Sequence, residues 1–255
     1  MSDKIVNLFD LQKIFEKKMP KAILDYYQSG ARDEITLKKN RDIFNNYELL
    51  PKLLRNVSDI DTSINILDLQ LRNPIILGPI AMQQMAHQKG ELASAAAAEK
   101  FGFKAIVFTA DAPQLGTREN DERNKFKMPE NLSLGNFKGT VFEKFSDHEG
   151  SSMNMHNELL FDKTLTFEII HWIKETADLP VLVKGILRPD DAAQCLENKA
   201  DGIIISNHGG RQLDTATSTL KQVEPIRKEI GTKALLIVDG GIRRGTDVLK
   251  SLALG

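Results

Sequence analysis

The stretch VLVKGILRPDDAAQCLENKADGIIIS, residues 181–206, joins two short apolar runs through a segment with helical spacing. The runs Val181 to Lys184 and Gly202 to Ser206 lack the polar alternation of a half-exposed strand, so they predict parallel strands covered on both faces. Between them, residues 189–198 predict a helix. A strand, a helix and a second parallel strand form one βαβ unit, which indicates an α/β fold.

The same alternation extends to both sides of this unit. The predicted strands are Pro74 to Pro79, Ala105 to Thr109, Val181 to Lys184, Gly202 to Ser206 and Ala234 to Asp239. The predicted helices between them cover about residues 89–100, 164–177, 189–198 and 217–230, and a final helix begins near Thr246. Before the first strand, apolar spacing predicts helices over residues 8–18 and 20–29, with Gly30 as a C-cap, and then a surface connection over residues 40–66.

Repeated strand–helix pairs favour either a doubly wound sheet or a (β/α) barrel. The sequence has no Rossmann glycine fingerprint, so we favour the TIM (β/α)8-barrel type. Five predicted strands are fewer than the eight of a closed barrel, and residues 74–255 fall short of the about 250 that such a barrel usually takes. We therefore expect a single domain in which an N-terminal helical segment and connection, residues 1–73, precede an incomplete barrel, residues 74–255.

Composition excludes several classes of protein. The 34 Lys and Arg residues balance 35 Asp and Glu residues, which argues against a nucleic-acid binder. No run reaches the 18 apolar residues of a membrane span, and Met1 to Phe15 lacks the apolar core of a signal peptide, so a soluble intracellular protein is expected. The single cysteine, Cys195, forms no intrachain disulfide and is expected to be a small apolar residue of a helix. No Cys/His cluster has zinc-ligand spacing, so we expect no metal.

Polar or glycine-rich clusters follow all five predicted strands, at the end where barrel enzymes place their chemistry. The most informative is SNHGGRQLD, Ser206 to Asp214, which sets a histidine three residues before an arginine. An imidazole accepts a proton near neutral pH, and a guanidinium group binds a carboxylate in bidentate fashion. His208 and Arg211 therefore favour a substrate with an acid group next to an oxidisable carbon. A structural, capping role for His208 is the alternative.

Several motifs together resemble the FMN-dependent 2-hydroxy-acid oxidases and dehydrogenases, the family of glycolate and lactate oxidases. They are DYYQSGA (25–31), GPIAMQQMAH (78–87), TADAPQLGTRE (109–119), LVKG (182–185), SNHGGRQLD (206–214) and DGGIRRGTDVLKSLALG (239–255). They occur in the order of the family and span nearly the whole chain. An unrelated phosphate-binding barrel would require SNHGGRQLD to be accidental.

The resemblance implies roles for residues that handle the substrate. His208 would be the base that removes the substrate proton as two electrons pass to flavin N5, and Asp111 would orient its imidazole and stabilise the protonated form. Arg211 and Arg118 would hold the substrate carboxylate, and Tyr26 would hydrogen-bond to it. Two alternatives stay open at this stage: Tyr26 as an ordinary core aromatic, and Arg118 as a solvated surface charge.

The resemblance also implies an FMN site. Lys184 would lie near N1 and the C2 carbonyl of the flavin, where a cation favours the anionic reduced ring. The other residues expected to contact FMN are Pro79, Ile80, Ala81, Thr109, Ser206, Asp239, Gly240, Gly241 and Arg243. Glycines suit this role because they let backbone N–H groups approach a phosphate closely.

The chain departs from the family pattern at two places. Ala96-Ala-Ala-Glu-Lys100 runs directly into Phe101-Gly-Phe-Lys-Ala105, which predicts that two βα units have been excised, with a flavin-contacting serine and glutamine and a second substrate tyrosine. At Gly255 the chain stops within an apolar helical pattern, so we expect a truncated C-terminus without the eighth strand and its Gly-Arg pair. The ending Ala-Leu-Gly is no peroxisomal tripeptide, although many relatives are peroxisomal, and this favours the cytoplasm.

The function implied is FMN-dependent oxidation of (S)-2-hydroxy acids of the glycolate and L-lactate class to 2-oxo acids. Oxygen, giving hydrogen peroxide, or another acceptor would then reoxidise the flavin, and a homo-oligomer is expected because relatives are commonly tetramers. The alternative is a catalytically inactive, truncated or spliced family member that at most binds full-length homologues. This alternative has a physical basis, because an open parallel sheet leaves unpaired strand edges.

Overall fold

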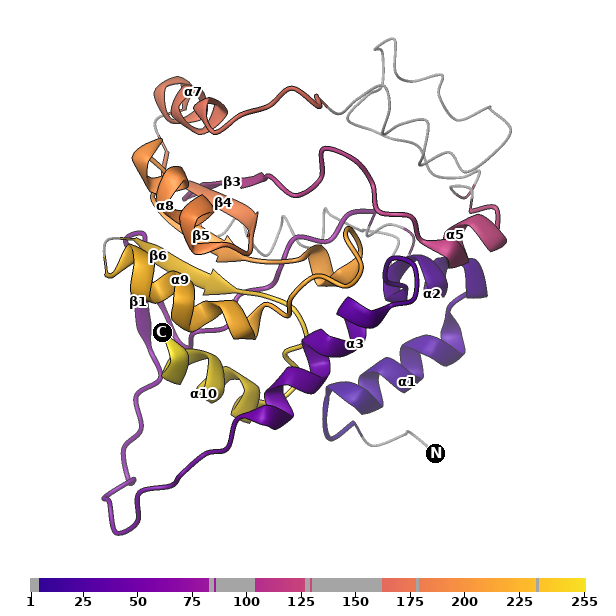
Figure 1. Cartoon of the computed structure of the whole chain (residues 1–255). Coiled ribbons are helices and arrows are strands. Elements are labelled where there is room, and N and C mark those ends of the chain that lie inside the picture. Colours follow the sequence, from indigo (N-terminus) through magenta and orange to yellow (C-terminus); the bar gives the residue numbers. More distant parts are fainter. Residues whose placement is uncertain are drawn as a thin grey trace.

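The computed structural model describes residues 5–82, 85, 104–126, 129, 162–177, 179–232 and 234–255. Its centre is a parallel sheet of four strands in the order β3-β4-β5-β6, which is also their order along the chain (Figure 1). The strands are β3 (Ile106–Thr109), β4 (Val181–Ile186), β5 (Gly202–Ile205) and β6 (Leu235–Val238). A separate antiparallel hairpin joins β1 (Ile64–Ile66) to β2 (Leu69–Leu71). The parallel sheet therefore has half the strands of a closed (β/α)8 barrel.

The register of the parallel strands aligns their carboxyl ends. Thr109 at the end of β3 pairs with Lys184 of β4, and Ile205 of β5 pairs with Val238 of β6. The ladder between β4 and β5 is interrupted at Gly185, whose φ is +108°. Glycine adopts this conformation without steric cost. The residues that follow the four strands therefore lie along one edge of the sheet.

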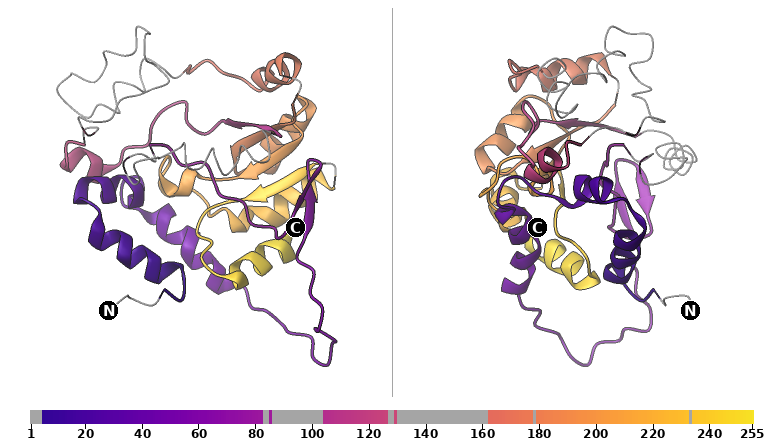
Figure 2. Two further views of the ribbon diagram at one scale, coloured as in Figure 1. Left: turned by 180° about the vertical axis from the view of Figure 1, so that it is seen from behind. Right: turned by 90° about the vertical axis from the view of Figure 1, so that its right-hand side faces the viewer.

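Helices cover one face of the sheet. They are α7 (Glu168–Thr176), α8 (Pro189–Glu197), the 3₁₀ turn η5 (Leu220–Gln222), α9 (Val223–Ile230) and α10 (Gly245–Leu254). Alternate residues of the central strands, Val181 and Val183 on β4 and Ile203 and Ile205 on β5, are buried in the core beneath them. In the side view of Figure 2, α7, α8 and α9 lie on one side of the sheet and the β1–β2 hairpin on the other.

The N-terminal helices pack beside the loops of the sheet. They are α1 (Leu8–Lys18), α2 (Lys21–Gln28) and α3 (Ile35–Asp42), followed by the 3₁₀ turn η1 (Ile43–Asn46). Helix α1 begins after Asn7, whose side-chain oxygen accepts hydrogen bonds from the N–H groups of Phe9 and Asp10. Helix α3 is capped by a distant residue: Asp214 accepts from the N–H groups of Ile35 and Thr36. This cap joins the N-terminal segment to the loop after β5.

Most of the sequence-based predictions of secondary structure are confirmed. Helices α1, α2, α7, α8 and α10 and strands β3 to β6 lie where the apolar patterns place them, with ends shifted by a few residues. The helix expected over residues 217–230 becomes the 3₁₀ turn η5 followed by α9. Cys195 is buried in α8 as expected, and burial raises the pKa of its thiol to about 12. The helix expected near residues 89–100 lies outside the described residues.

The strand expected over Pro74 to Pro79 is wrong. This segment belongs to no strand within the described part of the chain, and Ile75, Ile76 and Leu77 are exposed by 59%, 50% and 94%. An apolar run becomes a buried strand only where neighbours supply hydrogen bonds and cover both faces. Helix α3 and the β1–β2 hairpin were not predicted, because α3 is polar and depends on its distant cap.

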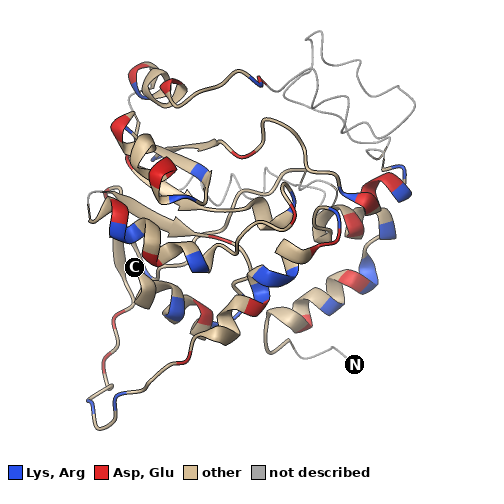
Figure 3. Ribbon diagram, in the orientation of Figure 1, with Lys and Arg blue, Asp and Glu red and all other residues tan. Residues whose placement is uncertain are grey.

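The distribution of charged side chains agrees with the balanced composition. Lys and Arg side chains are interspersed with Asp and Glu side chains over the ribbon, in keeping with a formal net charge of −1 (Figure 3). Within the described residues, no helix has both the length and the apolar character that crossing a bilayer requires.

The buried face of β5 provides a test of this packing. Ile205→Ala removes methyl groups from a side chain with no solvent exposure, and we expect a loss of about 2–5 kcal/mol in the free energy of unfolding. Ile60→Ala is a matched control, because Ile60 is 70% exposed, and it should change this free energy by less than about 0.5 kcal/mol. Urea unfolding followed by circular dichroism measures both. Equal losses would contradict the assignment of β5 to the core.

Candidate active site

Polar side chains from three of the four parallel strands meet at the carboxyl edge of the sheet. Lys184 is buried near the end of β4, and its ammonium nitrogen lies 3.6 Å from Oδ2 of Asp239, which follows β6. The hydroxyl group of Ser206, which follows β5, donates to the same carboxylate oxygen at 3.0 Å. Thr109 pairs in register with Lys184 and so ends β3 at the same edge. The structure therefore brings together four of the residues expected to contact a flavin.

The predicted base and its carboxylate partner are in contact. Oδ1 of Asp111 lies 3.0 Å from Nδ1 of His208, although the two residues follow β3 and β5, which are separated by β4. The side chain of Asp111 lies against Gly185 of β4. A Cβ on Gly185 would be only 2.5 Å from the Cβ of Asp111. Glycine is thus required sterically at this position. Because Nδ1 faces the carboxylate, Nε2 is the ring nitrogen that can accept a proton from a substrate.

His208 is held by a strained turn, η4 (His208–Gly210). The φ of His208 is +56°, and Gly209 and Gly210 also have positive φ, a conformation uncommon for residues other than glycine. The side-chain oxygen of Asn207 accepts from the Gly210 N–H at 3.1 Å and from the Asn40 amide at 2.7 Å, and the Asn207 amide donates back to Asn40 at 2.8 Å. This buried pair fastens the turn to α3. Neither asparagine was singled out from the sequence.

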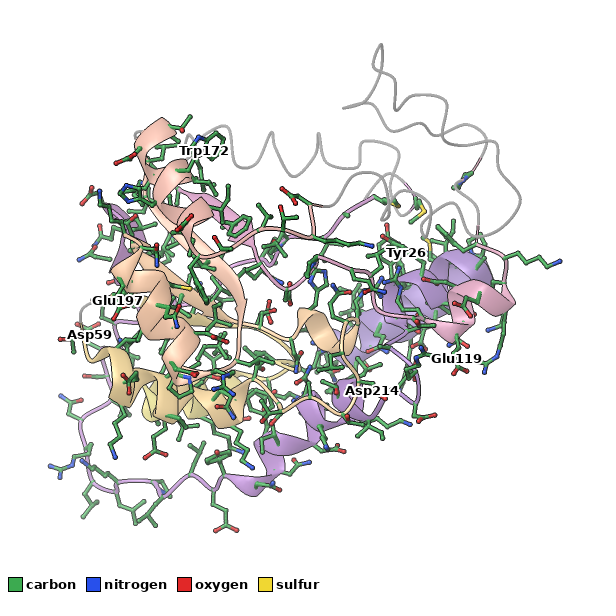
Figure 4. The ribbon with its side chains drawn as sticks, turned by 45° about the horizontal axis from the view of Figure 1, so that its top comes forward. Tyr26, Asp59, Glu119, Trp172, Glu197 and Asp214 are labelled. Atoms are coloured by element: carbon green, nitrogen blue, oxygen red, sulfur yellow. The ribbon has the colours of Figure 1, made fainter. Side chains whose placement is uncertain are left out.

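Two arginines flank Tyr26. The guanidinium carbons of Arg211 and Arg118 lie 5.2 and 5.9 Å from the centre of the Tyr26 ring. Nη1 of Arg211 donates to the carbonyl oxygens of Tyr26 and Ser29 at 2.6 and 3.0 Å, and Nε of Arg118 donates to Asp121 at 2.7 Å. Figure 4 shows Tyr26 on the side of α2 that faces the strand ends. The three residues expected to bind a carboxylate therefore form one cluster.

Burial distinguishes between the alternatives for Arg118 and Tyr26. Arg118 is only 7% exposed, so it is not a solvated surface charge. Tyr26 is buried and stacks on Phe126, with the ring centres 4.9 Å apart, so it is a core aromatic whatever else it does. Burial lowers the pKa of Arg211, and the neighbouring charge of Arg118 lowers it further. A bound anion would relieve the repulsion between these two cations.

Three buried carboxylate oxygens have no hydrogen-bond partner among the described residues: Oδ2 of Asp111, Oδ1 of Asp121 and Oδ1 of Asp239. Burial raises the pKa of Asp239, while Lys184 and Ser206 partly oppose this effect. Buried acceptors are normally paired, so unpaired ones mark a place where a ligand with donor groups would fit. Asp111 and Asp239 were predicted to act at the site, whereas Asp121 was not and is the partner of Arg118.

The loop after β6 is built on its glycines and on Asp247. Gly240 and Gly241 have φ values of +95° and +76°, and a Cβ on Gly241 would lie 1.9 Å from the carbonyl oxygen of Asn40. The carboxylate of Asp247 accepts from the N–H groups of Arg243 and Arg244 at 2.9 and 3.0 Å, and from the Arg41 guanidinium at 2.6 Å. The Arg243 side chain is exposed. Its predicted contact with a phosphate stays a prediction.

The remaining parts of the site are residues 79–81 and Gln212. Pro79, Ile80 and Ala81 lie in the exposed segment after Leu77, so their predicted contact with the flavin also stays a prediction. Gln212 was quoted within SNHGGRQLD without a role, yet its amide bridges to the loop that carries Asp111. The only sequence signal for Gln212 was its place directly after Arg211 in a specific motif.

Comparisons with known proteins agree with this geometry. A family model described as FMN-dependent dehydrogenase matches residues 15–103 and 96–255. Glycolate oxidase 3 of Arabidopsis thaliana is 36% identical over 300 residues, which cover 99% of this chain and 82% of the relative. A peroxisomal (S)-2-hydroxyacid oxidase of the same plant is 36% identical over 301 residues, with the same coverage. The crystal structure of mandelate oxidase with (S)-4-hydroxymandelic acid superposes with a TM-score of 0.90 and 31% identity, over 98% of this chain and 84% of that chain.

These comparisons confirm the predicted internal deletion. An alignment of 300 residues is longer than the chain of 255, so the relatives have residues within the aligned region that this chain lacks. The family model also matches in two parts that overlap at residues 96–103, where the excision was predicted. The joined segment itself lies outside the described residues.

The carboxylate of Asp247 leads to a pH-dependent prediction. Burial alone would raise its pKa, but the hydrogen bonds from the Arg243 N–H, Arg41 and the Arg244 N–H outweigh burial and hold the pKa below its usual value. The ionised carboxylate therefore stabilises the fold above pH about 4, and this stabilisation is lost as the pH falls through the lower folded-state value. Asp247→Asn should cost about 2 kcal/mol at pH 7 and progressively less below pH 4.

Urea unfolding of the parent and the variant at a series of pH values measures this difference. Asp42→Asn, at an exposed position of α3, is the control and should leave stability almost unchanged at every pH. A cost for Asp247→Asn that is the same at pH 7 and at pH 3 would show that the charge of Asp247 is unimportant.

Proposed function

Because the chain belongs to the FMN-dependent dehydrogenase family, we propose that it oxidises (S)-2-hydroxy acids of the glycolate and L-lactate class to 2-oxo acids, with FMN as cofactor. The observation that carries the proposal is the His208–Asp111 pair together with the cluster of the buried Arg118, the half-buried Arg211 and Tyr26. The names of the relatives support the substrate class, since they include glycolate, (S)-2-hydroxyacid and mandelate oxidases. Oxygen or another electron acceptor is the second substrate.

The residues at the strand ends fit a flavin. A buried ammonium group at Lys184 suits a ring that becomes anionic on reduction, and the hydroxyl groups of Thr109 and Ser206 can hydrogen-bond to polar ring edges. The unpaired Oδ1 of Asp239 is an acceptor that the hydroxyl groups of a ribityl chain would satisfy. Gly240, Gly241 and Arg243 would hold the phosphate end.

His208 performs the proton transfer in this proposal. Its Nε2 accepts the proton of the substrate, while the Asp111 carboxylate at Nδ1 stabilises the imidazolium that results. The substrate loses two electrons and two protons as the hydroxyl carbon becomes a carbonyl. One proton goes to Nε2 of His208, and a bound FMN would supply the acceptor for the two electrons and the other proton. The strained turn η4 keeps the imidazole at the strand ends rather than free in solvent.

The arginines orient the substrate. Arg118 and Arg211 both hold a guanidinium group within 6 Å of the centre of the Tyr26 ring, at 5.9 and 5.2 Å, and a carboxylate bound beside this ring would pair with both. Their positions are fixed before a ligand binds, because Arg118 is held by Asp121 and Arg211 by backbone carbonyls. Preorganised cations lose little freedom when they bind an anion. The inactive family member, the alternative reading of the sequence, gains no support from these comparisons.

An absorbance spectrum tests the proposed function directly. The purified chain is incubated with excess FMN, desalted, and mixed under anaerobic conditions with glycolate or L-lactate. We expect visible flavin bands that survive desalting and bleach with at least one of the acids. A colourless protein after desalting, or flavin bands that neither acid bleaches, would overturn the proposal.

His208→Asn tests the assignment of the base. The variant removes the proton acceptor but not the residues that contact FMN, so we expect normal FMN retention and a rate of flavin reduction lowered by about 10²–10⁴-fold. His171→Asn is the matched control, because His171 lies half-exposed on α7 beside Glu175 and should leave the rate unchanged. Stopped-flow absorbance measures both rates. A His208→Asn variant that reduces flavin as fast as the parent would exclude His208 as the base.

A further inference from the structure

We propose that Gln212 is the positioning residue that holds Asp111 against His208, an inference that rests on the proposed function. The geometry creates a need for such a residue. Asp111 and His208 follow strands that are not neighbours, so no ladder hydrogen bond sets the distance between their loops. The last hydrogen bond between β3 and β4 before Asp111 runs from the Ala110 N–H to the Lys184 carbonyl at 2.8 Å.

The side chain of Asp111 does not fix its own position. One carboxylate oxygen contacts His208, and the other is buried without a partner among the described residues. A carboxylate with an unpaired buried oxygen gains free energy by turning toward water or another donor. Something other than the carboxylate must therefore keep the backbone of Asp111 in place.

Gln212 provides that restraint through both ends of its amide. Its Nε2 donates to the carbonyl oxygens of Asp111 at 2.7 Å and Gln114 at 3.1 Å, and its Oε1 accepts from the Gly116 N–H at 2.9 Å. The loop also lies directly on the backbone beside Gln212: a Cβ on Gly116 would come within 2.2 Å of the Arg211 carbonyl oxygen and 2.3 Å of the Gln212 carbonyl oxygen. The Gln212 side chain therefore connects residues 111 to 116 to the loop that carries His208.

Gln212 is itself well anchored. The residue before it, Arg211, donates to backbone carbonyls at the end of α2, and Asp214 caps α3 (Figure 4). Because Arg211 and Asp214 are bonded to other parts of the molecule, the backbone of Gln212 is held in place. The hydrogen bond from its side chain therefore restrains the backbone of Asp111. Arg118 has separate supports, since Asp121 binds its guanidinium and the Arg32 N–H donates to the Thr117 carbonyl at 3.0 Å. Loss of the Gln212 amide should therefore disturb Asp111 more than the carboxylate-binding cluster.

The first experiment measures flavin reduction by L-lactate or glycolate in the FMN-loaded parent, Gln212→Ala and Gln212→Glu. We expect the rate to fall about 10–100-fold in both variants, as is typical for a residue that orients a catalytic partner. The apparent Kd of the hydroxy acid should change less than threefold. The acid limb of the rate–pH profile should move to lower pH, because a loosened Asp111 stabilises the protonated imidazole less.

Gln222→Ala is the matched control. Its amide also makes a side-chain hydrogen bond, to Thr217 at 3.2 Å, but it lies away from the Asp111 loop. The control should match the parent in rate and in pH profile. Gln212→Glu keeps the size of the side chain while removing both donor N–H bonds, so it remains informative if Gln212→Ala does not fold.

Hydrogen–deuterium exchange supplies a readout that is independent of turnover. The peptide that spans residues 110–118 should exchange faster in the Gln212 variants than in the parent and in Gln222→Ala, because both variants lose the bonds donated to the Asp111 and Gln114 carbonyls and Gln212→Ala also removes the acceptor of the Gly116 N–H. If the parent itself fails to bleach with either acid, the proposed function fails, while the exchange data still test the restraint. Unchanged exchange, or faster exchange with an unaltered rate and pH profile, would overturn the role of Gln212.

Discussion

The contact of Asp111 with the backbone at Gly185 is the constraint on which the candidate site depends. Parallel strands place their carboxyl ends at one edge, but they also keep β3 and β5 apart by the full width of β4. A catalytic pair drawn from these two strands can form only by passing over the strand between them. The positive φ of Gly185 and the absence of a side chain there open that passage. Lys184, the residue before Gly185, has its ammonium nitrogen 3.6 Å from Oδ2 of Asp239 at the same edge.

The N-terminal segment has a structural role that its composition does not indicate. Helix α3 is polar and supplies no residue to the proposed chemistry, yet it contacts the loops that follow β5 and β6 at several points. Asn40 pairs with Asn207, Asp214 caps its first turn, and Arg41 binds Asp247. Gly210 and Gly241 are the points at which the loops press closest on this helix. The barrel-type sheet therefore provides the edge, and the helix outside it fixes how the loops lie on that edge.

The sequence predicted the parts that local pattern controls. Apolar runs located β3 to β6, and the resemblance to a family located His208, Asp111 and the cluster of Tyr26, Arg118 and Arg211, which the structure brings together. The parts it did not predict depend on distant contacts. Pro74 to Pro79 has the composition of a strand but no paired neighbour within the described residues, and α3 has the composition of a loop but a cap 179 residues away. The roles of Asn40 and Gln212 are likewise invisible until the chain has folded around them.

The contacts of α3 also determine when the site can form during synthesis. A nascent chain that has emerged only as far as residue 200 contains α3 and two strands of the parallel sheet, β3 and β4, but not Asn207, Asp214, Gly241 or Asp247. Contacts between such remote positions make folding slow, because long loops must close before any of these bonds is gained. The N-terminal helices are thus made first and docked last. Until then their stability depends on their own weak helical propensity.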